Sequence, residues 1–243
     1  RSHRVVETPD LPLATAEVAR AALAVRGARP GRVDLVQPAD GRVRVLARPD
    51  GDRSRPTPEV VEERVGERLF RVDAGGFWQV HRLAARTLTG LVRDELTAAG
   101  GVDPEGLHLD LYGGVGLFAA TLAEMGGSST RVINVESDSR ATEHAGENLV
   151  EWIGARAETA RADRFVAGLA AGASERERER LARGVVLLDP PRAGAGREVV
   201  EGIAALAPAT VVYVACDPVA LSRDLATFAE HGYVAANGIR GVD

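Results

Sequence analysis

The sequence of 243 residues has no lysine, a single cysteine and no long apolar run. One cysteine cannot form an internal disulfide bond, and it cannot supply the four thiolates of an iron–sulfur cluster or a structural zinc site. No apolar run reaches the ~18 residues that a transmembrane helix requires, and no signal peptide is recognisable. We therefore expect a cytoplasmic protein that holds no metal or iron–sulfur cluster and does not enter the membrane.

The charge balance is slightly acidic, and arginine carries all of its positive part apart from histidine. The chain has 30 arginines against 35 acidic residues, a formal net charge of −5. Exclusive use of arginine, together with abundant alanine, glycine and valine, is typical of a genome rich in G and C, so the number of arginines does not by itself indicate nucleic-acid binding. Any RNA-binding face must be a local surface.

Residues 1–74 differ from the rest of the chain and predict a small α+β subdomain. Apolar residues recur at helical spacing in one segment, and polar and apolar residues alternate in the segments that follow. The expected elements are a helix over 15–25, strands over 32–37 and 42–47 joined by a turn, and two short strands within 60–72 around Gly66.

Residues 75–243 alternate strand and helix patterns, which predicts an α/β domain with a parallel sheet covered by helices on both faces. Between Trp152 and Gly172 the pattern indicates one more strand and one more helix without showing where they begin. The other expected strands lie at 107–111, 132–135, 185–188, 211–216 and near Tyr233, and the other expected helices at 81–99, before Met125, and at 139–150, 174–183, 198–206 and 219–231.

The only cysteine, Cys216, lies where an apolar strand gives way to a helix. Asp217 is predicted as the N-cap of that helix and Pro218 as its first residue, so free N–H groups and the positive end of the helix dipole lie near the sulfur. A lone cysteine is most often a small buried apolar residue. A strand-to-helix turn at the edge of a parallel sheet instead favours a reactive thiolate.

A glycine-rich turn follows the predicted strand 107–111. The segment Gly114-Val-Gly-Leu-Phe-Ala119 satisfies G-x-G-x-x-[G/A], and Glu136 ends the next strand. The glycines allow close approach of a ligand, and the carboxylate can accept hydrogen bonds from ribose hydroxyls. The pattern suits an NAD-dependent oxidoreductase, a methyltransferase that uses S-adenosylmethionine (SAM), or a tight turn that binds nothing.

The segment Asp189-Pro-Pro-Arg192 follows a fully apolar strand. Two prolines make a rigid turn with few hydrogen-bond donors, which would hold the carboxylate of Asp189 at the edge of the sheet, beside the cofactor and facing the substrate. A nicotinamide enzyme does not need this element, so it favours methyl transfer. A stiff loop with a capping aspartate is the alternative.

Taken together, five blocks resemble the RNA uracil-C5 methyltransferases, which use SAM to make 5-methyluridine in tRNA or rRNA. The resemblance runs from about residue 60 to the end, and its most specific parts are the blocks around Asp189 and Cys216. The blocks are Phe77-Trp-Gln-Val-His81, Asp110-Leu-Tyr-Gly-Gly-Val-Gly116, Glu136 with Ala145 and Asn148 after it, Asp189-Pro-Pro-Arg-Ala-Gly194, and Tyr213-Val-Ala-Cys-Asp-Pro218 with Arg223-Asp224.

The resemblance implies a Rossmann-like SAM methyltransferase fold and a role for each matched residue. Cys216 would add to C6 of uracil and turn C5 into an enolate-like carbon that attacks the methyl group of SAM. Asp217 and Pro218 would orient the thiol, and Arg192 would contact RNA phosphate or the target base. Asp189 is implied both to contact the cofactor and to act in catalysis at the target base. The residues implied to line the cofactor site are Gln79, Tyr112, Gly114, Gly116, Glu136 and Asp189.

The chain also departs from the family pattern. The family usually has cysteine where Gly113 stands, and often a polar residue where Leu117 stands. The general base of the family, which removes the C5 proton, is a glutamate in a His-x-Glu block that would come after Asp243. The N-terminal RNA-binding barrel of the family would precede this sequence. We therefore expect the chain to be the central subdomain and the catalytic domain of a longer protein, acting as a monomer.

Two other functions are compatible with the same residues. One is a SAM methyltransferase for a protein or a small molecule, in which Cys216 is structural. The other is a non-catalytic RNA-binding module that keeps the methyltransferase fold.

Overall fold

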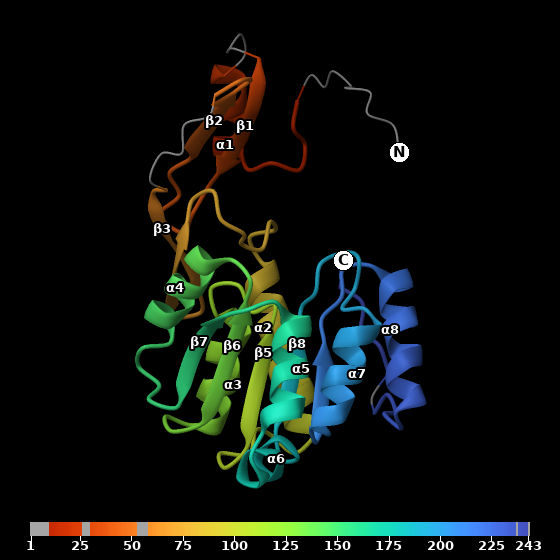
Figure 1. The fold of residues 1–243 in the computed structure, drawn as a ribbon. Helices are drawn as coiled ribbons and strands as arrows, with labels where there is room; N and C mark the ends of the chain where they lie inside the picture. The colour runs from red at the N-terminus through yellow and green to blue at the C-terminus, as the bar shows by residue number, and fades with distance from the viewer. Residues whose placement is uncertain (1–9, 26–29, 53–57, 237, 243) are drawn as a thin grey trace. The chain divides into compact units, whose positions relative to one another are not determined.

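The computed structural model describes residues 10–25, 30–52, 58–236 and 238–242. The chain divides into two compact units, Arg1–Trp78 and Gln79–Asp243 (Figure 1).

Within the described residues, the first unit has one helix and two antiparallel hairpins, which confirms the elements expected from its sequence. Thr15 caps the helix by accepting a hydrogen bond from the backbone N–H of Val18 (3.3 Å). Near the hairpins, the Arg44 guanidinium pairs with both Asp40 and Glu59. The elements are α1 (Ala16–Ala24), β1 (Gly31–Val36) paired with β2 (Arg44–Pro49), and β3 (Val60–Val65) paired with β4 (Arg68–Asp73).

The second unit is built on a five-stranded sheet in which all strand pairs are parallel. The strand order is β7-β6-β5-β8-β9, so the chain builds one half of the sheet outward from β5 and then crosses to build the other half. In such doubly wound sheets ligands bind at the carboxyl ends of the strands where the order reverses, here between β5 and β8. The strands are β5 (Leu107–Leu111), β6 (Arg131–Glu136), β7 (Ala155–Thr159), β8 (Val185–Leu188) and β9 (Thr210–Tyr213).

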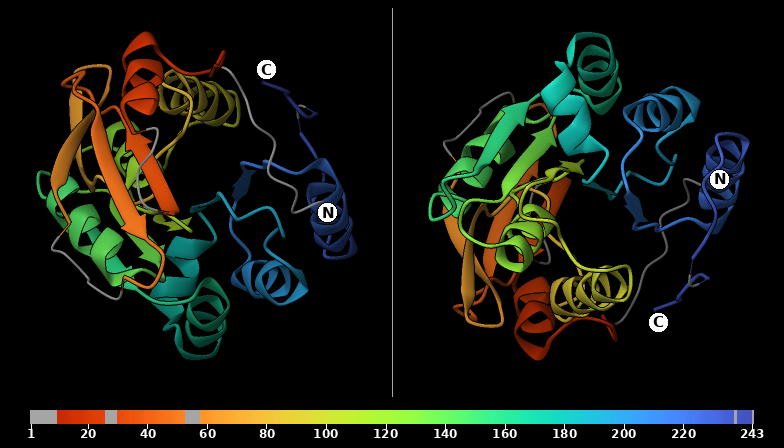
Figure 2. Two further views of the ribbon diagram at one scale, coloured as in Figure 1. Left: turned by 90° about the horizontal axis from the view of Figure 1, so that it is seen from above. Right: turned by 90° about the horizontal axis from the view of Figure 1, so that it is seen from below.

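Helices cover both faces of this sheet. In Figure 1, α5 and α7 lie in front of the sheet and α2 and α3 lie behind it, and the views in Figure 2 show the same two layers. The helices are α2 (Ala84–Ala98), α3 (Leu117–Gly126), α4 (Ser139–Asn148), α5 (Ala162–Gly172), α6 (Glu175–Leu181), α7 (Arg197–Leu206) and α8 (Pro218–Glu230). This arrangement confirms the α/β fold expected from the sequence.

The core of the unit lies between the central strands and the helices packed on them. Every residue of β5 and β8 is buried. β8 is accordingly a continuous apolar run, whereas β5 alternates leucine with the buried polar residues His108 and Asp110. Leu109 and Leu188 pack in one cluster with Val199 and Ile203 of α7. Burial of each such side chain contributes about 1.5–3 kcal/mol.

Two strand predictions were wrong in the C-terminal part of the chain. The strand expected to reach Cys216 ends at Tyr213, because its partner β8 ends at Leu188 and Val214 makes the last bond across the pair (N–H to the Leu188 carbonyl, 2.9 Å). Tyr233 does not lie in a strand. Its N–H bonds back to the Phe228 carbonyl (3.1 Å) and so closes the end of α8.

Candidate functional site

A tight glycine turn connects β5 to α3 at the carboxyl edge of the sheet. Tyr112, Gly114 and Gly116 have φ values of 60°, 51° and 92°, and Gly116 is the N-cap of α3. Left-handed backbone at every second position of this turn requires glycine or costs strain, which is why Gly114 and Gly116 are glycines. Tyr112 adopts this conformation with a half-buried side chain, and burial raises its pKa to about 12.

The neighbouring strand β6 holds this turn in place. Gly113 N–H donates to the Val135 carbonyl (3.1 Å) and Gly114 N–H donates to Oε2 of Glu136 (3.2 Å). The side-chain amide of Asn134 donates to the Gly114 carbonyl (3.3 Å). Both polar groups of Gly114 are therefore fixed by side chains of β6.

The two oxygens of Glu136 have different surroundings. Oε1 accepts the backbone N–H of Ser137 (2.6 Å), the Ser137 hydroxyl (3.0 Å) and the N–H of Asp138 (2.8 Å). Oε2 faces the glycine turn and accepts from Gly114. Oε2 accepts this single hydrogen bond and has a second lone pair, so it keeps the capacity to bind a hydroxyl group at the turn.

Asp110 is a site residue that the sequence did not assign. It lies in the centre of β5, fully buried, and its Oδ2 accepts the backbone N–H of Ala119 in the first turn of α3 (2.7 Å). Burial raises the pKa of this carboxyl to about 8, against the opposing Ala119 bond, and the negative charges of Asp189 and Glu136 add to the rise. The signals for it were an acidic residue in the run Leu107-His-Leu-Asp-Leu111 and its place at the start of the block Asp110-Leu-Tyr-Gly-Gly-Val-Gly116.

This raised pKa predicts how the stability of the second unit depends on pH. Between about pH 4 and pH 8 the folded state holds a proton on Asp110 that the unfolded state has lost, so the free energy of unfolding should fall as pH rises, by about 1.4 kcal/mol per pH unit for one proton. Asp110→Asn keeps an oxygen for Ala119 and should remove this slope. Chemical denaturation of the wild type and of Asp110→Asn between pH 6.5 and 7.5 measures the difference between their slopes, since Asp189 and Glu63, whose pKa values are raised to about 6 and about 7, titrate in both proteins.

The exposed Asp94 of α2 provides the matched control for that measurement. Asp94→Asn should leave the slope of the wild type unchanged. Equal slopes for the wild type and Asp110→Asn would show that Asp110 is ionised throughout this range, contrary to the assignment.

Asp189 follows the last residue of β8, as expected. Its backbone N–H bonds to the Leu111 carbonyl (3.3 Å), and its Oδ2 accepts a long hydrogen bond from the side-chain amide of Gln79 (3.4 Å). Burial raises the pKa of Asp189 to about 6, while the Gln79 bond opposes the rise. The structure thus brings together Gln79 and Asp189, two residues 110 positions apart that the family pattern had grouped.

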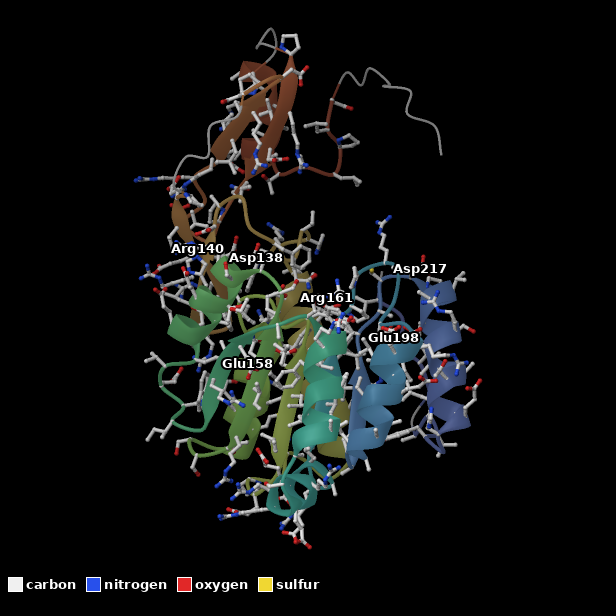
Figure 3. The ribbon with its side chains drawn as sticks, viewed as in Figure 1. Asp138, Arg140, Glu158, Arg161, Glu198 and Asp217 are labelled. Carbon is white, nitrogen blue, oxygen red and sulfur yellow. The ribbon has the colours of Figure 1, made fainter. Side chains whose placement is uncertain are left out.

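Cys216 is exposed in the turn between β9 and α8. Asp217 is the N-cap of α8, because its Oδ1 accepts the N–H groups of Val219 (3.0 Å) and Ala220 (2.9 Å), and Pro218 is the first residue of the helix. The expected capping arrangement is confirmed. In Figure 3, Asp217 lies at the same edge of the sheet as Asp138, which caps α4.

The turn after β8 and the turn after β9 line one pocket. Its lining residues are Pro190, Pro191, Gly194, Tyr213, Ala215, Cys216, Asp217 and Ala220. Arg192, from the same turn as the two prolines, has an exposed side chain.

A buried carboxylate joins the two turns that line this pocket. Oδ2 of Asp224 in α8, which is 1% exposed, accepts the Tyr213 hydroxyl (2.7 Å) and the Ala195 N–H (2.7 Å). Arg223 donates to the Ala193 carbonyl (2.6 Å). Burial acts to raise the pKa of Asp224. The hydrogen bonds that its carboxylate accepts outweigh burial and lower the pKa. The role of Arg223-Asp224 could not be predicted from the sequence, because these side chains bond to residues about 30 positions away.

The site therefore has two halves on one sheet edge, on either side of the switch point between β5 and β8. One half is the glycine turn with Glu136, and the other is the pocket with Cys216 next to the Asp189 turn. Among the residues that the structure describes, no cluster of three or more His, Cys, Asp or Glu side chains could hold a metal ion. No helix in the described ranges is long and apolar enough to cross a membrane.

Comparison with known proteins adds relatives to this geometry. No protein-family model matches the chain. The chain is 40% identical over 206 residues to a Streptomyces coelicolor protein named an uncharacterized RNA methyltransferase, covering 84% of this chain and 40% of that protein. A Streptomyces avermitilis protein of the same description is 42% identical over 173 residues, covering 71% and 37%. The chain thus spans about two fifths of the length of these relatives.

One solved structure matches with a TM-score of 0.52. It is the tRNA (uracil-54, C5)-methyltransferase of Pyrococcus abyssi in complex with S-adenosyl-L-homocysteine (SAH), with 24% identity over 77% of this chain and 40% of that chain. This similarity shows that the chain shares a Rossmann-like α/β fold with that structure, as the sequence predicted.

Proposed function

We propose that this chain belongs to a SAM-dependent RNA methyltransferase and carries the residues that bind SAM and hold the target base. The observation that carries the proposal is the placing of the glycine turn and the Cys216 pocket on one edge of a methyltransferase sheet. The names of the relatives from the two Streptomyces species support RNA as the substrate.

The residues around the glycine turn fit the adenosyl part of SAM. Oε2 of Glu136 has an open acceptor position for a ribose hydroxyl, since three donors already occupy Oε1. Gly114 and Gly116 present backbone without side chains, and Tyr112, Gln79 and Asp189 extend this half of the site toward the pocket. When bound, SAM supplies an electrophilic methyl group on a sulfonium sulfur.

The finer proposal is methylation of uridine at C5 through a covalent bond to Cys216. The thiolate adds to C6 of uracil, and the electron pair of the C5–C6 bond moves into an enolate over C5 and O4. C5 attacks the methyl group and SAH leaves. A base then removes the proton from C5, the C5–C6 double bond forms again, and the bond between C6 and sulfur breaks.

Three features of the pocket suit this sequence of steps. Cys216 is exposed at the N-terminal end of α8, where a bound base can reach its sulfur. Asp189 precedes the two prolines of the pocket wall and would orient the base, and the exposed Arg192 would contact phosphate or the base. The target uridine would leave its stack to reach Cys216 at the pocket.

The test uses the full-length protein, SAM with a labelled methyl group, and total tRNA and rRNA. After digestion to nucleosides, mass spectrometry should find the label in 5-methyluridine. Label in a methylated guanosine, in a ribose 2′-O-methyl group or in protein alone would overturn uridine C5 as the target.

A further inference from the structure

Gly113 is a glycine for reasons of space and not of backbone conformation. Its φ is not among the positive values of the turn, so other residues could adopt its backbone geometry. A Cβ atom at this position would overlap Oδ1 of Asn134, and it would lie 2.8 Å from Cγ of Asn134 and 2.9 Å from Oδ2 of Asp110. The side chain of Asn134 therefore occupies the volume that a residue at position 113 would need.

Asn134 is an unusual residue for its place in the fold. It is fully buried in the apolar strand β6, between Ile133 and Val135, and its Oδ1 has no hydrogen-bond partner among the described residues. A buried amide with an unpaired oxygen costs stability relative to an apolar side chain of the same shape. Packing alone thus does not explain an asparagine here.

The hydrogen bond to the glycine turn offers an explanation. Asn134 and Glu136 stand two residues apart on β6, so their side chains lie on the same face of the strand. Asn134 donates to the carbonyl of Gly114 (3.3 Å), and Glu136 accepts its N–H (3.2 Å). The two side chains fix the orientation of the peptide groups on either side of Gly114, at the point where the cofactor would approach.

We propose that Gly113 and Asn134 form a coupled pair in which the amide fills the space of the missing side chain and positions Gly114 for binding of the adenosyl cofactor. Asn134 is thus a positioning residue of the cofactor site. The pair explains why position 113 holds glycine, because any residue with a Cβ atom there would collide with Asn134. This inference rests on the proposed function for its effect on cofactor affinity, but the packing of the pair stands independently of it.

A double-mutant cycle tests the packing. Gly113→Ala should lower the melting temperature of the protein by several degrees, because the new methyl group meets the amide. Asn134→Ala removes the two amide atoms and leaves only Oδ2 of Asp110, 2.9 Å away, so the double variant should recover part of the loss caused by Gly113→Ala. Gly146→Ala is the matched control, since Gly146 is exposed in α4 and a Cβ there meets nothing within 4 Å. If the two substitutions change the melting temperature additively, the proposed coupling between Gly113 and Asn134 is wrong.

Binding of SAH to the same variants tests the positioning role. Asn134→Leu keeps the branched shape and removes the donor, so it should leave the melting temperature close to the wild-type value and weaken SAH binding about five- to tenfold, as expected for one lost hydrogen bond. Unchanged SAH affinity in this variant would overturn the positioning role. Absence of SAH binding by the wild type would instead refute the proposed function, while the melting temperatures would still decide the packing.

Discussion

Cys216→Ala should abolish methyl transfer to RNA, with turnover reduced roughly 1,000-fold or more, while the affinity for SAH stays within about twofold of wild type. The loss is large because C5 of uracil becomes nucleophilic only after a thiolate has added to C6. The cofactor half of the site should be unaffected, since Glu136 and the glycine turn are held by β6 and not by the turn after β9.

The position of Cys216 makes this result interpretable. The residue is exposed, so its truncation creates no cavity in the core and the variant should fold. Ser222→Ala, at an exposed position on α8, is the matched control and should keep full activity. Ordinary turnover by Cys216→Ala would refute the covalent mechanism and favour a structural cysteine.

Glu136→Gln should weaken SAM and SAH binding by about 10- to 150-fold, which corresponds to the 1.5–3 kcal/mol of a hydrogen bond to a charged group. The wild-type carboxylate accepts three hydrogen bonds at Oε1 and one at Oε2. A glutamine has a single acceptor oxygen, so it cannot serve the Ser137 side and the ribose hydroxyls together. Isothermal titration with SAH measures the change.

Glu201→Gln gives the comparison for this substitution, because Glu201 is an exposed carboxylate on α7 that pairs with Arg197. It should bind SAH as the wild type does. If Glu136→Gln also binds with unchanged affinity, the cofactor does not contact Glu136, and the assignment of this half of the site is wrong.

The central strands could be predicted from the sequence because they are buried on both faces. Val185-Val-Leu-Leu188 is entirely apolar and was placed to the residue. The edge strand β7, Ala155-Arg-Ala-Glu-Thr159, has no fully buried residue and therefore shows no apolar run. Its position follows from pairing with β6, which a single sequence does not reveal.

The same distinction applies to the site. The N-cap at Asp217 was predictable because its partners are two and three residues away. The roles of Asn134 and Asp224 were not, since they come from contacts with Gly114 and Ala195, which lie 20 and 29 residues away in the sequence. Local chemistry could be predicted, whereas the contacts that hold the turns in position required the structure.

The most direct measurement for the proposed mechanism follows the hydrogen on C5. RNA is transcribed with uridine that carries deuterium at C5 and is then methylated by the full-length protein. The mass of the product nucleoside is measured by mass spectrometry. The mechanism predicts that every methyl group gained is accompanied by the loss of one deuterium, with the hydrogen at C6 retained. A methylated uridine that keeps its deuterium would contradict it, because the methyl group would then lie elsewhere on the nucleoside.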